Sequence, residues 1–214
     1  MHSFNVTIDG ESFSLSSYDH FRDYFGSNAE RVETATRDWF FQNLTKEDTI
    51  FDIGANIGLF TVLFSKKAGK VYAFEPTDTY DNFLIPNLQK NGVSVNTHKL
   101  AFGDKAGKHE DRIFKVWGTP AEVSSYDFDT IDSFIESSGA IPTYLKIDVD
   151  SFEVEVLNGA RRFLTEHSPT VVVEINEEAL GMRGFRGSDI LAIMSDLGYS
   201  EIGALDENHI FRKQ

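Results

Sequence analysis

From residue 49 onward, short apolar runs alternate with longer segments in which apolar residues recur every three or four positions. The short runs predict strands, at 49–55, 70–76, 93–104, 143–149, 169–175 and in a terminal hairpin over 201–213. The longer segments predict helices, at 58–69, 78–91, 129–138, 151–167 and 188–197. Strands that alternate with helices predict a doubly wound α/β fold, with a mostly parallel sheet, helices on both faces and an antiparallel terminal hairpin.

The first 45 residues follow a different pattern. Residues 1–15 alternate around Asp9-Gly10, which predicts a small hairpin, and 29–44 predict a helix. We therefore expect an N-terminal extension over 1–45 and one domain over 46–214. Pro86 is expected to kink or shorten the helix at 78–91. Residues 105–126 predict short irregular strands or a loop.

Acidic residues stand at or near the end of every predicted strand in the domain. In an open α/β sheet, ligands bind beyond the carboxyl ends of the strands, where the strand order reverses. This rule selects a short set of candidates, namely Asp52 to Gly58, Glu75, Ala101 to Asp104, Asp148 and Glu174.

The segment FDIGANIG places Gly54 and Gly58 at a strand-to-helix turn, which either lets the backbone approach a ligand or simply permits a tight turn. Glu75 follows at the tip of the next strand, where a carboxylate reaches ribose hydroxyls. The dinucleotide fingerprint G-x-G-x-x-G is not met, because Asn56 stands at its second glycine position. Asp52 would repel a pyrophosphate but suits an ammonium, so S-adenosylmethionine fits better than NAD.

The segment YLKIDVDSFE, residues 144–153, carries three charges on one face of a predicted core strand. Asp150 with Glu153 predicts a capping box on a helix that starts near Ser151. Lys146 is expected to pair with Asp148, and Glu174 should lie beside them on the next strand. This cluster predicts either a buried ion pair without chemistry or a general base for a hydroxyl acceptor. Alternatively, Asp148 and Glu174 would share Mg²⁺ or Ca²⁺.

The chain has 214 residues, a net charge of −14 and no cysteine. The charge argues against nucleic acid or an anionic membrane as a partner, and the lack of cysteine excludes disulfides and thiolate chemistry. No signal peptide or membrane span is visible, so a cytoplasmic protein is expected.

Six segments, taken in order, resemble the successive blocks of the FkbM family of S-adenosylmethionine-dependent methyltransferases, namely FDIGANIGLFT, YAFEP, LAFGD, DTIDSF, LKIDVDSFEVEVLNGA and VVVEIN. The resemblance implies a class I methyltransferase fold with a seven-stranded sheet, and methylation of a hydroxyl oxygen on a sugar, glycan or small natural product. It also implies that the methionine part is held by Asp52, Gly54, Asn56 and Gly58. Glu75 would bind the ribose and the backbone near Ala101 the adenine.

One departure stands out, because the family pattern D-V-E-G is here Asp148-Val149-Asp150-Ser151. The shorter acid and the bulkier turn residue bear on the acceptor pocket and on any metal site. Two other functions stay open, a nicotinamide-dependent oxidoreductase or epimerase and a non-catalytic nucleotide-binding module. Asp148 is the expected base, Glu174 the second candidate, and Lys146 would tune Asp148 or stabilise the developing alkoxide.

The acceptor is expected to meet the least regular segments, which are the N-terminal extension, 105–126 and 181–187. The candidates there are aromatic residues for stacking on a sugar, arginines for an anionic group and histidines as rival bases, namely Trp117, Tyr126, Arg183, Arg186, His20 and His109. The identity of the acceptor and the oligomeric state do not follow from the sequence.

Overall fold

The computed structural model describes residues 1–25, 32–113 and 123–213. Its centre is a seven-stranded sheet whose strands are, in spatial order, β11 (Tyr199–Leu205), β12 (Asn208–Lys213), β10 (Thr170–Glu174), β9 (Tyr144–Ile147), β3 (Thr49–Ile53), β4 (Lys70–Phe74) and β5 (Asn96–His98). The five strands from β10 to β5 are parallel to one another, and β12 runs antiparallel to both of its neighbours. The predicted mostly parallel sheet with an antiparallel terminal hairpin is therefore confirmed.

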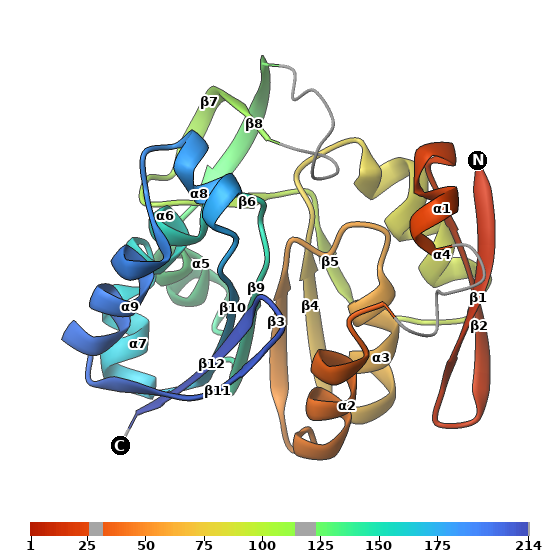
Figure 1. The fold of residues 1–214 in the computed structure, drawn as a ribbon, viewed down its shortest axis with the longest axis horizontal. Coiled ribbons are helices and arrows are strands. Elements are labelled where there is room, and N and C mark those ends of the chain that lie inside the picture. The colour runs from red at the N-terminus through yellow and green to blue at the C-terminus, as the bar shows by residue number, and fades with distance from the viewer. Residues whose placement is uncertain (26–31, 114–122, 214) are drawn as a thin grey trace.

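Helices cover both faces of this sheet (Figure 1). One face carries α2 (Thr34–Asn43), α3 (Leu59–Lys67) and α4 (Ile85–Lys90). The other face carries α5 (Ile131–Ser138), α6 (Glu153–Asn158), α7 (Arg161–His167) and α9 (Gly187–Asp196). Successive strand residues alternate between two apolar cores: Ile50 packs toward α2 and α3, whereas Phe51 packs toward α5. No helix in the described segments is both long and apolar enough to cross a membrane.

Two predicted elements are divided in the structure, and one helix is additional. The strand predicted at 93–104 is divided into β5 and β6 (Ala101–Phe102), and β6 joins a second sheet with β7 (Gly107–Arg112) and β8 (Val123–Asp129). The helix predicted at 151–167 is divided into α6 and α7 around Gly159, which lies so close to Gly103 that a Cβ there would be 2.0 Å from its carbonyl oxygen. An additional short helix, α8 (Glu177–Met182), follows β10.

Pro86 does not end its helix but coincides with a change of helix type. A π-helical turn over Tyr80–Leu84 leads directly into α4, and Pro86 lies within the first two positions of α4. A proline is tolerated there, because the first N–H groups of an α-helical segment have no partner inside it.

The N-terminal hairpin is confirmed as β1 (His2–Ile8) paired with β2 (Glu11–Ser17), and it is followed by a 3-10 turn over Asp19–Phe21 and by α1 (Arg22–Phe25). The β2 strand is joined to α4 by two asparagine side chains. Asn91 and Asn87 each bond both the N–H and the C=O of a β2 residue, at 2.8–2.9 Å. Asn87 also donates to Ile57 O, at 2.8 Å. The outer edge of the hairpin is therefore paired with side chains instead of another strand.

Candidate active site

The strand order reverses between β3 and β9, and two turns meet at this point. The turn after β3 contains Gly54, whose φ is +87° and whose Cβ, if present, would lie 1.7 Å from the carbonyl oxygen of Asp148. Asp148 N in turn donates to Ile53 O at 3.0 Å. Gly54 is thus required by the close approach of the two turns, which brings the segments after β3 and β9 to one place.

The turn that leads into α3 is fixed by a carboxylate from the neighbouring strand. Glu75, at the end of β4, accepts a hydrogen bond from Asn56 N at 3.1 Å and from both the N–H and the hydroxyl of Thr77, at 2.9 and 2.6 Å. Asn56 has a φ of +48°, and Gly58, with a φ of +93°, begins the helix. Burial raises the pKa of Glu75, and the hydrogen bonds from Thr77 and Asn56 oppose this effect.

The charged strand β9 is explained by an ion cluster on the α3 face of the sheet. Lys146 lies opposite Asp52 in the register of β9 and β3, and its Nζ is 2.6 Å from Asp148 Oδ2. The ammonium also lies 4.4 Å from the centroid of the Phe60 ring. Burial alone would lower the pKa of Lys146, but the carboxylates of Asp148, Glu33 and Asp52 outweigh it and raise the pKa above its ordinary value. Lys146 is therefore a buried, permanently charged ammonium.

Two of these carboxylates keep an oxygen without a hydrogen-bond partner in the described parts of the chain. Thr61 donates to Asp52 Oδ2 at 2.6 Å, whereas the buried Asp52 Oδ1 and Glu33 Oε2 accept nothing. Burial raises the pKa of both side chains. Glu33 lies in a left-handed conformation before α2. It was not predicted, because nothing in the local sequence of the extension shows that this residue reaches the sheet.

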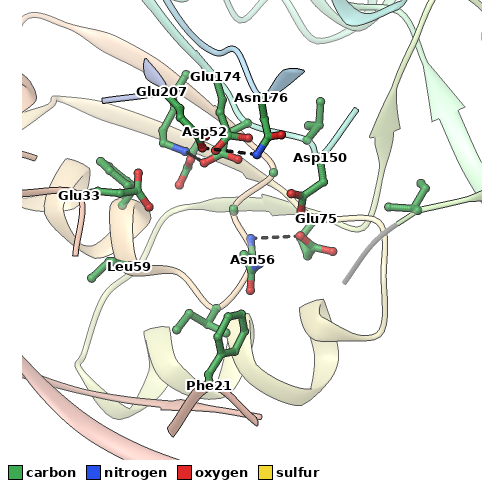
Figure 2. Close-up of a pocket in the computed structure, with 18 of the residues that line it drawn as sticks. Phe21, Glu33, Asp52, Asn56, Leu59, Glu75, Asp150, Glu174, Asn176 and Glu207 are labelled. Atoms are coloured by element: carbon green, nitrogen blue, oxygen red, sulfur yellow. Dashed lines mark hydrogen bonds and ion pairs between the residues drawn. The ribbon is translucent and has the colours of Figure 1, made fainter. Parts of the chain in front are cut away.

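A cavity of about 520 Å³ opens over these residues. Figure 2 shows Glu174, Asn176 and Glu207 gathered with Asp52 at one end, Glu75 and Asp150 along the adjacent wall, and Phe21 and Leu59 at the opposite end. The N-terminal segment also contributes His20, Phe25 and Glu33 to the lining. The predicted candidates from the mouths of β3, β4, β9 and β10 thus line one cavity, together with residues of the N-terminal extension, which was expected to meet the acceptor.

Ala101 lies apart from the main cavity. It lines a much smaller one, of about 20 Å³, together with Leu100 and Phe102. The two cavities share Gly54, Pro76 and Val149 as lining residues, so they are adjacent. Gly58 does not line either of them; a Cβ at this residue would lie 2.9 Å from the Leu84 side chain.

The predicted capping box at Asp150 is wrong. Helix α6 begins only at Glu153, its N-cap residue is Phe152, and no side chain caps it. Asp150 and Ser151 instead have φ values of +49° and +104°. This turn is held by Glu153, whose Oε1 accepts from Val149 N at 3.1 Å and from Ser151 N at 3.4 Å. The side chain of Asp150 is free to line the cavity.

Asp150 and Glu174 share an unusual environment. Burial is the main cause that raises the pKa of each, and the neighbouring carboxylates, Asp148 in both cases, raise it further. Within the described residues no hydrogen bond or ion pair joins either side chain to the protein. The charge of Lys146 lowers both pKa values, but by less than burial and the carboxylates raise them, and neither carboxylate has an ion pair of its own in the described chain.

The other candidates divide into one that reaches the cavity and several that do not. His20 lines the cavity, whereas His109 stacks on Phe128 in the second sheet, with 4.1 Å between ring centroids. Tyr126 is buried in the core beneath that sheet. Arg183 is occupied, because it pairs with Glu155 at 2.7 Å and with Asp111 at 3.2 Å. Arg186 precedes α9 and is not a lining residue; Trp117 lies outside the described residues.

The described residues contain no preformed site for the divalent metal ion of the alternative mechanism. No three His, Asp or Glu side chains among residues 1–25, 32–113 and 123–213 are arranged to hold a metal ion. Asp148 and Glu174 line the same cavity, but Asp148 is already paired with the buried ammonium of Lys146.

Comparison with known proteins identifies the family. The model of the methyltransferase FkbM domain matches residues 52–201, which include β4, β5, β9 and β10 completely, β3 and β11 in part, and not β12. The chain belongs to the FkbM methyltransferase family. A curated relative, the hexuronic acid methyltransferase AglP of Haloferax volcanii, is 30% identical over 177 residues, which cover 78% of this chain and 70% of the relative.

Solved structures share the fold of this FkbM methyltransferase. The FkbM methyltransferase of Methylobacillus flagellatus KT is 21% identical with a TM-score of 0.55, over 79% of this chain and 44% of that protein, so the chain spans less than half of its length. The 16S rRNA N2 G1207 methyltransferase of T. thermophilus, solved with AdoMet and guanosine, is 10% identical with a TM-score of 0.57, over 100% of this chain and 50% of that protein. At these identities the likeness establishes the class I methyltransferase fold alone.

Membership of this family makes the chain a methyltransferase and removes the nicotinamide-dependent oxidoreductase or epimerase from consideration. The backbone conformation of this chain also explains why the family pattern D-V-E-G has a glycine at its fourth position. The corresponding Ser151 has a φ of +104°, a value that favours glycine, so the departure leaves a strained residue beside the cavity.

Proposed function

We propose that this FkbM methyltransferase transfers a methyl group from S-adenosylmethionine to a hydroxyl oxygen of a sugar, a glycan or a small natural product. The observation that carries this proposal is the Lys146–Asp148 pair, which stands at the switch point of the sheet and lines the same cavity as Glu75. A carboxylate held by a buried ammonium is suited to orient a hydroxyl and to receive its proton.

The cavity residues fit S-adenosylmethionine. Glu75 lies at the tip of β4 with its carboxylate fixed toward the turn at Asn56, where it would accept the ribose hydroxyls. The unpartnered Asp52 Oδ1 suits the ammonium of the methionine part, and Gly54 and Asn56 line the wall between them. We infer that the adenine would enter the small cavity beside Ala101, which would have to widen to admit the ring.

The donor supplies a methyl group on a positively charged sulfur, which is a good electrophile without further activation. The residues of this chain have two tasks. Asp148 would accept the proton of the acceptor hydroxyl as the hydroxyl oxygen takes up the methyl group, and the electron pair of the broken carbon–sulfur bond would stay on the departing S-adenosylhomocysteine. Lys146 fixes Asp148 Oδ2 and stabilises the negative charge that develops on the acceptor oxygen. Glu174 is the second candidate for the proton.

The class of acceptor rests on the relative from Haloferax volcanii, whose name states that it methylates a hexuronic acid. Phe21 of the N-terminal segment also lines the cavity and contributes apolar surface beside the carboxylates.

The first experiment is calorimetric titration with S-adenosylmethionine and, separately, with NAD. We expect the first to bind and NAD not to bind, and Glu75→Ala to abolish the binding. Glu178→Ala is the matched control, because this exposed glutamate lies on α8 outside the cavity. Binding of NAD alone, or unchanged affinity in Glu75→Ala, would contradict the proposal.

The second experiment separates a catalyst from a non-catalytic nucleotide-binding module. Asp148→Asn keeps the size of the side chain but cannot accept the proton, so we expect methyl transfer to fall by about 10²–10⁴-fold, while S-adenosylmethionine still binds. Turnover that is unchanged in Asp148→Asn would remove this residue from the mechanism. Turnover that requires Mg²⁺ or Ca²⁺ and is abolished by chelation would favour the metal alternative.

A further inference from the structure

The described lining of the cavity has an unbalanced charge. It contains seven carboxylates and one lysine, and the carboxylates come from Glu33, Asp52, Glu75, Asp148, Asp150, Glu174 and Glu207. Glu207 is exposed, and Asp150 and Glu174 are half-buried, so a ligand that enters the cavity would desolvate these carboxylates and would have to supply the opposite charge. The question is how many of these groups are already neutralised by the protein or by the proposed donor.

Four of the seven have a partner or an assigned role. Lys146 serves three of them, because its ammonium is paired with Asp148 and is held charged by Asp52 and Glu33 as well. Glu75 bonds the turn at Asn56 and Thr77. Three carboxylates are left over, and they come from three different places in the chain.

These three are Asp150 in the turn after β9, Glu174 at the end of β10, and Glu207 in the turn between β11 and β12. Figure 2 shows Glu174 and Glu207 together with Asn176 at one end of the cavity, and Asp150 on the adjoining wall. Asn176 donates to Glu207 at 3.4 Å, and in the described chain neither Asp150 nor Glu174 receives a hydrogen bond or an ion pair. The adjoining Asp52 is fully buried, and its Oδ1 has no hydrogen-bond partner in the described chain, although Thr61 donates to Oδ2.

We propose that the methyl acceptor carries a basic nitrogen as well as the hydroxyl, and that Asp150, Glu174 and Glu207 hold it as an ammonium. The acceptor class is then an amino sugar or an aminated polyol. This inference rests on the proposed function, since it concerns the same cavity. The protonated nitrogen is not the nucleophile; it fixes the molecule so that a neighbouring hydroxyl reaches Asp148.

Two other ligands suit these carboxylates less well. A hexuronic acid would place its own carboxylate against three others, and like charges at short range repel strongly away from bulk water. A divalent ion needs several oxygen ligands that converge on one point, and no three acidic or His side chains in the described chain are arranged in this way. An ammonium carries N–H donors that point in different directions. It can therefore form hydrogen bonds to carboxylates that do not converge on one point.

The test uses four matched sugars, each titrated into the protein saturated with S-adenosylhomocysteine, namely glucosamine, N-acetylglucosamine, glucose and glucuronate. We expect glucosamine to bind at least tenfold more tightly than N-acetylglucosamine or glucose, and glucuronate to bind most weakly. Glu174→Gln and Glu207→Gln should each weaken glucosamine binding about tenfold, since each removes one charge-assisted hydrogen bond. Glu178→Gln, on the exposed face of α8, should leave it unchanged.

Equal affinity for glucosamine and glucose, absence of glucosamine binding, or tighter binding of glucuronate would overturn the inference. So would binding of glucosamine that survives unchanged in both glutamine variants. Titration with S-adenosylhomocysteine alone distinguishes failure of this inference from failure of the proposed function. A protein that binds this product but does not prefer the amine retains the proposed function and loses only the acceptor class.

Discussion

The buried ammonium of Lys146 allows a quantitative test of the ion cluster. Lys146→Met retains an unbranched apolar stem and removes the charge. The Lys146 side chain is 2% exposed and that of its partner Asp148 is 23% exposed. Removing one member of a buried ion pair typically costs about 3–5 kcal/mol, because the other charge stays behind without compensation. Asp148 regains some hydration, but the fully buried Asp52 does not, so we expect a loss of about 3 kcal/mol.

Substitution of the partner, Asp148, should destabilise the protein less. Asp148→Asn leaves Lys146 with the carboxylates of Asp52 and Glu33, so we expect a loss of about 1 kcal/mol. The double variant should cost less than the sum, with a coupling of about 1–3 kcal/mol. The measurement is urea unfolding followed by circular dichroism at neutral pH, and exposed Lys90→Met is the matched control. If Lys146→Met costs no more than Lys90→Met, or if the two losses add, the cluster does not stabilise the fold as argued.

Three further predictions follow from the two turns beside the cavity. Gly54→Ala should unfold the protein at markedly lower urea concentration and abolish S-adenosylmethionine binding, because its Cβ would collide with Asp148 O at 1.7 Å, whereas Gly181→Ala, with nothing within 4 Å, should do neither. Ser151→Gly should raise stability by about 1 kcal/mol by relieving a φ of +104°; a lower melting temperature would count against this strain. Burial raises the pKa of Glu153 from 4.5 to about 7, so the folded state binds this proton more tightly than the unfolded state. Stability should therefore fall as pH rises from about 4.5 to 7, by roughly 3 kcal/mol for this group, and Glu153→Gln should flatten that part of the profile.

The sequence predicts well what periodicity controls. Alternation within β9 places Lys146 and Asp148 on one face, and the alternation of strands with helices places Asp52, Glu75 and Glu174 at one edge of the sheet. These features depend on local geometry that repeats along the chain, so a single sequence contains them.

The features that the sequence does not predict depend on contacts between distant segments of the chain. The helix predicted at 151–167 is interrupted where Gly159 packs against the carbonyl of Gly103, and no local signal in the sequence predicts that contact. Asp150 was expected to cap a helix, but the chain there adopts positive φ and Glu153 turns back to bond the backbone. Glu33 reaches the cavity only through the packing of the N-terminal segment, whose separation as an extension over 1–45 stays a prediction.

The hydrogen bonds that join the asparagine side chains of α4 to the backbone of β2 determine which positions of this sequence can change in evolution. Asn87 and Asn91 bond the backbone of Ser14 and Ser16, not their side chains. Substitution of either serine therefore costs little, whereas substitution of Asn87 would release the hairpin and the Ile57 carbonyl in the turn beside the cavity at once. In descendants of this chain the two serine positions should therefore vary more freely than the two asparagines, while the buried apolar positions of β1 and β2 stay apolar.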